Sequence, residues 1–342
     1  MIRMNKEETK ILSYLSDNLG DGGNIREMSE SINKKYGPAY YSNIYHTTNR
    51  LKQIGIVGIA QEGKNRKITL NTENPLSTYY MSEIESHKAS QIGLSKEMLS
   101  SIQDLAEKFN IFSICTLETE KYLKINRIEM LILTWNHDDD SKLIRSLLQT
   151  ESEQGIKIDP CIFSIDEFIR MMQTDELNPI KDLIQNKCVL HNSEGFWSLI
   201  NHHKIGIKKE KLGRFTHDLT EEELAYNYNR QGYQLNERIR PSEKISLETT
   251  IFSMSIKNKT RIKYGAIILL YKNIEKINWA YLFYMYKRYD ELNRFKSILL
   301  SLASLRNMSS NADIGRYIGI ITGKPDATYD TKIVKKYIEV YG

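Results

Sequence analysis

The sequence is poor in cysteine and has no long uncharged hydrophobic run. Its 3 cysteines stand singly, without a CxxC pair, which argues against a zinc ribbon, a redox pair or a disulfide framework and predicts buried thiols. The longest apolar stretch, residues 264–286, is interrupted by charged side chains, so we expect neither a membrane-spanning helix nor a membrane partner. The N-terminus carries charges of both signs instead of an apolar signal region, which favours a cytoplasmic location.

The charge is unevenly distributed along the chain. A length of 342 residues, with 27% charged residues, predicts two or three globular domains. Lys and Arg exceed Asp and Glu by 3 in residues 1–75 and by 10 in residues 204–342, whereas acidic residues are in excess by 8 in residues 76–203. Basic termini attract polyanions over long distances, so an anionic partner is expected.

Helical periodicity predicts three helices near the N-terminus. The glycine-rich residues 20–23 end the first of them. Asn24, with Glu27 three residues later, forms an N-cap pair that begins the second. The break at Gly37-Pro38 separates the second helix from the third, and Pro38 suits the first turn of that third helix.

Two strand-forming segments follow, residues 56–60 and 67–70, and the basic tip between them indicates a β-hairpin. Three helices and a hairpin predict a winged helix. Residues 42–57, SNIYHTTNRLKQIGIV, resemble the recognition helix and wing junction of prokaryotic MarR/ArsR-like winged-helix regulators, in which a polar-faced helix precedes an L-x-x-x-G-h-V motif. The resemblance implies a helix-turn-helix domain that binds double-stranded DNA and, because such regulators usually pair on palindromic sites, a homodimer.

The third helix and the hairpin supply the side chains expected to contact DNA. Asparagine suits adenine, arginine suits guanine or a phosphate, and the basic hairpin tip suits the backbone or minor groove. The predicted DNA-binding residues are Tyr40, Asn43, His46, Asn49, Arg50, Lys64, Arg66 and Lys67. The alternative is a winged helix that serves as a protein-contact or dimerisation module, because its net charge is small.

The middle of the chain is predicted as a linker followed by a mixed α/β domain. Residues 76–94 are polar and interrupted by glycine, which indicates a linker or a linker helix. Residues 95–203 alternate helix and strand patterns, which indicates a small mixed sheet covered by helices. Residues 158–168, IDPCIFSIDEF, and 178–190, NPIKDLIQNKCVL, resemble the third strand and the C-terminal end of the minimal nucleotidyltransferase domain of the polymerase-β superfamily, as found in archaeal proteins.

The positions that would carry the transferase chemistry depart from that family. The resemblance implies a Gly-Ser pair for phosphates and a D-h-D pair that, with a third Asp, binds two Mg²⁺ ions. Arg127 and Glu129 stand at the D-h-D positions, Cys115 stands near the glycine position, and Asp159 alone matches. A cation at residue 127 repels a divalent metal, so we predict an inactive domain, without catalytic residues, metal or cofactor, that serves as a scaffold or sensor. The alternative is a divergent Mg²⁺-dependent nucleotidyltransferase that uses Glu129 and Asp159.

Residues 204–342 are predicted to be mostly helical, with one strand at residues 247–256. Their excess of cations faces either the duplex bound by the winged helix, which we expect, or the acidic middle of the chain. The sequence therefore predicts an α+β protein: a winged helix domain (1–75), a linker (76–94), a nucleotidyltransferase-like domain (95–203) and a basic helical C-terminal domain (204–342). Its predicted function is that of a DNA-binding transcriptional regulator.

Overall fold

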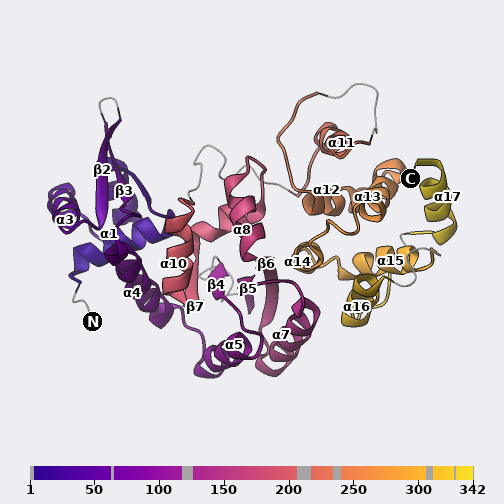
Figure 1. The fold of residues 1–342 in the computed structure, drawn as a ribbon, viewed down its shortest axis with the longest axis horizontal. Coiled ribbons are helices and arrows are strands. Elements are labelled where there is room, and N and C mark those ends of the chain that lie inside the picture. Colours follow the sequence, from indigo (N-terminus) through magenta and orange to yellow (C-terminus); the bar gives the residue numbers. More distant parts are fainter. Residues whose placement is uncertain are drawn as a thin grey trace. The chain divides into compact units, whose positions relative to one another are not determined.

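The computed structural model describes residues 4–62, 65–117, 126–205, 217–233, 240–305, 311–326 and 329–341. The fold is a mixture of helices and strands (Figure 1), as the sequence predicts. The chain divides into two compact units. Unit 1 comprises Met1–Trp135, Ile165–Gln173 and Ile180–Leu212, and unit 2 comprises Asn136–Ser164, Thr174–Pro179 and Gly213–Gly342. None of the described helices is both long and apolar enough to cross a membrane.

Unit 1 begins with three helices and a three-stranded antiparallel sheet of order β1-β3-β2. Figure 1 shows α1, α3 and the β2–β3 hairpin of this part. The elements are α1 (Lys6–Asp17), β1 (Asp21–Asn24), α2 (Ile25–Lys35), α3 (Tyr41–Gln53), β2 (Val57–Glu62) and β3 (Asn65–Leu70). The predicted N-cap is confirmed, because the Asn24 side chain accepts a hydrogen bond of 2.9 Å from the Glu27 amide. Two details differ from expectation. The third helix begins at Tyr41 instead of Pro38, and the glycine-rich segment pairs with β3 as a short strand.

The rest of unit 1 surrounds a second antiparallel sheet, in which β4 lies between β5 and β7. The elements are α4 (Pro75–Gln91), α5 (Lys96–Lys108), β4 (Ser113–Leu117), β5 (Arg127–Thr134), α8 (Ile165–Gln173), α9 (Pro179–Leu183), the 3₁₀ turn η2 (Ile184–Asn186), β7 (Cys188–His191) and α10 (Ser193–His202). Most of the predicted linker is the helix α4, which packs against α1, β7 and α10. It buries Met81, Ile84 and Glu85, so this segment belongs to the core of unit 1.

Unit 2 consists of one strand and eight described helices. They are α7 (Asp140–Gln154), β6 (Lys157–Ser164), α11 (Glu221–Arg230), α12 (Leu247–Ser255), α13 (Thr260–Lys272), α14 (Trp279–Arg288), α15 (Leu292–Ala303), α16 (Ala312–Ile320) and α17 (Thr331–Tyr341). The helix α14 is buried on nearly all sides and packs against β6, where the rings of Phe163 and Tyr281 lie 5.0 Å apart. The compact units therefore divide the chain differently from the predicted domains, because residues 136–164 pack with the C-terminal helices.

Two features of unit 2 bear on the sequence predictions. The strand predicted at residues 247–256 is wrong, because these residues form α12, which Ser246 caps by accepting a hydrogen bond of 3.2 Å from the Thr249 amide. Its β-branched residues favour strands in isolation, but burial among the neighbouring helices stabilises the helix.

Some C-terminal cations pair with the acidic middle segment. Lys287 contacts Glu151 at 2.8 Å, and Arg230 contacts Glu176 at 2.7 Å.

Candidate nucleic-acid interface

The helix α3 has one buried face and one polar, exposed face. Ile44, Thr48 and Leu51 recur at the spacing of one helix face and are fully buried in the core of unit 1. The rest of the helix carries amides, a histidine and cations, and no residue from 41 to 53 is acidic. An acid-free helix face beside a basic hairpin provides a surface of suitable charge and width for the major groove of duplex DNA.

The structure gathers the predicted DNA-binding residues on α3 and β3. Tyr40, the N-cap residue of α3, is 72% exposed. Asn43, His46, Arg50 and Arg66 are also exposed, whereas Asn49 and Lys67 are half-buried. Lys64 lies outside the described residues.

Two of the predicted cations already have partners within unit 1. The Arg50 guanidinium forms an ion pair with the Glu8 carboxylate of α1, whose side chain is only 8% exposed. Glu8 also accepts a hydrogen bond of 2.8 Å from the Asn5 amide as part of the capping box of α1. Lys67 contacts Asp21 at 3.4 Å. Arg50, which the sequence predicts to contact guanine or a phosphate, is therefore already paired with a carboxylate, because the folding of α1 against α3 places Glu8 beside it.

The tyrosines of α3 pack against each other along one flank of the helix. The rings of Tyr41 and Tyr45 are stacked with centroids 6.4 Å apart, and the ring of Tyr45 meets His46 edge-on at 5.7 Å. Tyr41 is nevertheless 55% exposed. These contacts orient Tyr45 and His46, while most of the Tyr40 and Tyr41 rings remains open to solvent.

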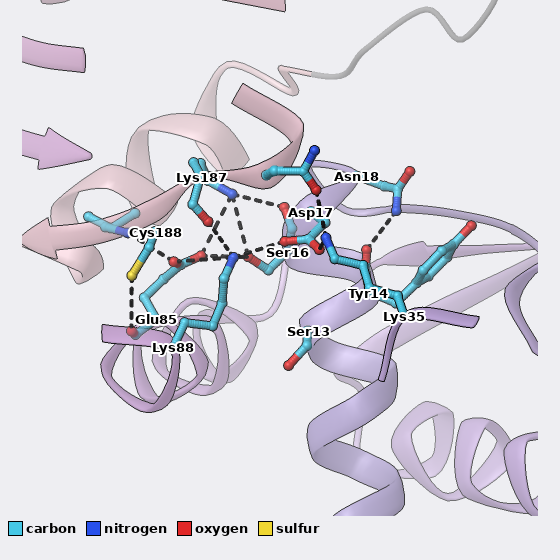
Figure 2. A network of polar contacts seen from close by, with 12 residues as sticks. Ser13, Tyr14, Ser16, Asp17, Asn18, Lys35, Glu85, Lys88, Lys187 and Cys188 are labelled. Atoms are coloured by element: carbon cyan, nitrogen blue, oxygen red, sulfur yellow. Dashed lines mark hydrogen bonds and ion pairs between the residues drawn. The ribbon is translucent and has the colours of Figure 1, made fainter. Parts of the chain in front are cut away.

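Sequence reasoning missed a buried ionic cluster that joins α1 to α4 and β7 (Figure 2). We refer to Ser16, Asp17, Glu85, Lys88 and Lys187 as the Glu85 cluster. The Glu85 carboxylate accepts hydrogen bonds from the Ser16 hydroxyl at 2.6 Å, the Trp197 indole at 3.2 Å and the Val189 amide at 3.0 Å. The spacing of Glu85 and Lys88 resembles that of an ordinary solvent-exposed helix pair, so no sequence signal indicates their burial.

Lys187 is the most deeply buried cation of the Glu85 cluster, with a fully buried side chain. Its ammonium group donates a hydrogen bond of 2.8 Å to the Ser16 carbonyl, in the last turn of α1. It also lies 3.6 Å from Glu85 and 4.6 Å from the centre of the Trp197 ring. Because a cation is stabilised at the C-terminal end of a helix, Lys187 attaches α1 to the second sheet.

Asp17 extends the cluster to α2. Its carboxylate accepts a hydrogen bond of 2.9 Å from Lys88 and also contacts Lys35 and the Tyr36 hydroxyl. Lys35 in turn donates a hydrogen bond of 2.6 Å to Asn186. The helices α1 and α2, which support α3, are thus attached by polar contacts to α4, η2 and β7.

The environment of the Glu85 cluster shifts the pKa values of its members. Burial alone raises the pKa of Glu85, but Lys88, Lys187 and the hydrogen bonds it accepts bring that pKa below its ordinary value. Asp17 behaves alike, because Lys88 and Lys35 outweigh its burial and lower its pKa. Burial lowers the pKa of Lys187. Burial also acts to lower the pKa of Lys88, but the negative charges of Glu85 and Asp17 outweigh it and raise that pKa.

We expect these carboxyl groups to make unit 1 acid-labile. The pKa values of Asp17 and Glu85 are lower in the folded protein than in the unfolded chain. At a pH of about 4, the unfolded chain therefore binds more protons than the folded protein. The stabilisation that these two carboxyl groups provide is therefore present in full above that pH and is lost progressively as the pH falls below it. Urea unfolding followed by fluorescence of Trp197, with Trp135 and Trp279 replaced by phenylalanine, measures this dependence. Glu85→Gln should make it shallower, and an unchanged pH dependence in that variant would contradict the assignment.

The positions implied by the transferase resemblance lie on strands of both units. Cys115 is fully buried in β4, opposite Leu131 of β5. Glu129 is buried on β5 of unit 1, and Asp159 is buried on β6 of unit 2. Within the described part of the chain, no group of three or more His, Cys, Asp and Glu residues is arranged to hold a metal ion. The three cysteines are buried thiols, as predicted.

Comparisons with protein-family models, with curated proteins and with solved structures found no match for this chain.

Proposed function

We propose that this protein binds double-stranded DNA through α3 and the β2–β3 hairpin and acts as a transcriptional regulator. The observation that carries the proposal is the exposed, acid-free face of α3, where Asn43 and His46 are open to solvent on a helix that packs against β2 of the basic hairpin. An α-helix fits the major groove, where amides and imidazoles can bind base edges, while neighbouring cations contact phosphates.

The Glu85 cluster holds α1 and α2 in place, and this supports a role of the interface in contacting bases. Base contacts require side chains held on rigid elements, and α3 packs against α1 and α2. The second sheet and α4 therefore serve as the scaffold of the DNA-binding helices in this proposal. A homodimer is part of the proposal, because two copies of α3 match two half-sites of a palindromic duplex.

Phosphate contacts by β3 are expected to appear in the salt dependence of binding. Each contacted phosphate makes the fall of log K with log salt steeper by about 0.9. Arg66→Ala should therefore weaken binding to all duplexes alike and reduce the slope by about 1. Lys96→Ala is the matched control, because Lys96 is an exposed cation of unit 1 at the start of α5.

Fluorescence anisotropy of the full chain with a labelled duplex, repeated over a range of salt concentrations, measures this slope. The proposal predicts a shallower slope for Arg66→Ala and an unchanged slope for Lys96→Ala. Equal slopes for both variants would show that β3 is not part of the interface. The absence of duplex binding at low salt would refute the proposed function.

A further inference from the structure

We infer that α3 selects A·T base pairs and recognises the methyl groups of thymine as well as the polar edges of adenine. This inference rests on the proposed function and adds the class of DNA sequence that the interface selects. It is carried by three features of α3: its amides, the engagement of Arg50 and its exposed tyrosines.

Amides dominate the polar face of α3. Asn43 and Gln53 are exposed, and Asn49 is half-buried. Within the described part of the chain, the structure gives none of these three side-chain amides a hydrogen-bond partner. An asparagine or glutamine amide can donate to N7 and accept from N6 of adenine in the major groove, which distinguishes adenine from the other bases.

The side chain best suited to guanine is engaged elsewhere. Arg50 is the single arginine of α3, and its Nη2 atom pairs with the largely buried Glu8 carboxylate. A bidentate contact with guanine uses two donors of the guanidinium group, so it competes with Glu8. Lys52 lies in the last turn of α3, so it is separated by about 16 Å along the helix axis from the N-terminal end that recognition helices direct towards the bases.

Two tyrosines are exposed at the N-terminal end of α3. In recognition helices, this end points towards the bases. Tyr40 is 72% exposed and Tyr41 is 55% exposed, and the Tyr40 side chain makes no capping hydrogen bond with α3. The thymine methyl is the apolar group on the major-groove edge of the base pairs, and aromatic or methyl-bearing side chains contact it. Exposed rings beside amides thus complement A·T pairs on both the adenine and the thymine side.

Replacing thymine by deoxyuridine isolates the methyl contact, because the two bases differ only in the C5 methyl and pair identically with adenine. The full chain is first used to select duplexes from a random-sequence pool, and the selected site is then prepared with thymine or with deoxyuridine. We expect an A·T-rich selected site and a loss of affinity of about fourfold or more for each contacted methyl that is removed.

The double variant Tyr40→Ala/Tyr41→Ala should bind the two duplexes equally. Tyr79→Ala is the matched control, since Tyr79 is an exposed tyrosine of α4 (41% exposed), and it should keep the full preference for thymine. A G·C-rich selected site, equal affinity of the unmodified chain for both duplexes, or tighter binding to single strands would overturn the inference while DNA binding itself stands. Failure to bind any duplex would refute the proposed function together with it.

Discussion

Replacing Lys187 by methionine is expected to lower the free energy of unfolding of unit 1 by about 3 kcal/mol. The substitution keeps the side-chain volume but removes a fully buried charge. Glu85 and the Ser16 carbonyl then lose their contacts with the ammonium group of Lys187. Removing one partner of a buried ion pair costs about 3–5 kcal/mol, and the remaining contact of Glu85 with Lys88 at 3.7 Å keeps the loss at the low end.

Lys35→Met is the matched control, because Lys35 contacts Asp17 of the same cluster but its side chain is 41% exposed. An exposed ion pair contributes about 1 kcal/mol or less, so this variant should remain close to the unmodified protein. The double variant Lys187→Met/Glu85→Gln should recover part of the loss, since it removes the second buried charge as well. Urea unfolding followed by Trp197 fluorescence measures all three, and equal stabilities of Lys187→Met and Lys35→Met would show that the Glu85 cluster does not support unit 1.

The Glu85 cluster also bears on truncation experiments. A fragment of residues 1–75 contains α1 but lacks Glu85, Lys88 and Lys187, so it would expose the polar groups of Ser16 and Asp17 that these residues contact. Comparisons of DNA binding therefore require the full chain, with substitutions at the surface in place of deletions.

The second large effect is expected at α3. The triple variant Asn43→Ala/His46→Ala/Asn49→Ala should lose about 100-fold or more in affinity for the selected duplex, because each specific base contact contributes about 1–3 kcal/mol. Binding to unrelated sequences should change little, since the phosphate contacts remain. Alanine is favourable in a helix and these side chains point away from the core, so the free energy of unfolding should stay within about 0.5 kcal/mol.

His87→Ala on α4 is the control for this variant, because His87 is another exposed histidine of unit 1. Anisotropy titrations with the selected duplex and with a scrambled duplex give both affinities. An equal loss on the two duplexes, or no loss on either, would contradict base recognition by α3.

Local sequence signals account for most of the secondary structure. The Asn24 N-cap, for example, marks the start of α2 where the structure places it. The hairpin could also be predicted, because its strand-forming segments flank a short polar tip. The helix α12 could not, since Thr249 and Thr250 favour a strand locally and only packing within unit 2 makes them helical.

The site could be predicted only where its residues are close in sequence. The exposed face of α3 follows from the spacing of Ile44, Thr48 and Leu51, whereas the Glu8 partner of Arg50 lies on a different helix. The Glu85 cluster depends on contacts between residues up to 171 positions apart, for which the periodicity of the chain gives no signal.

Photo-cross-linking from α3 tests the central claim most directly. The photoreactive amino acid p-benzoyl-phenylalanine is placed at position 46 of the full chain, or at position 96 or 142 as exposed controls on α5 and α7, and each protein is irradiated with the selected duplex. The proposed function predicts a covalent protein–DNA adduct from position 46 and little from the two controls. No adduct from position 46, or adducts of equal yield from all three positions, would contradict the assignment of α3 as the DNA-binding helix.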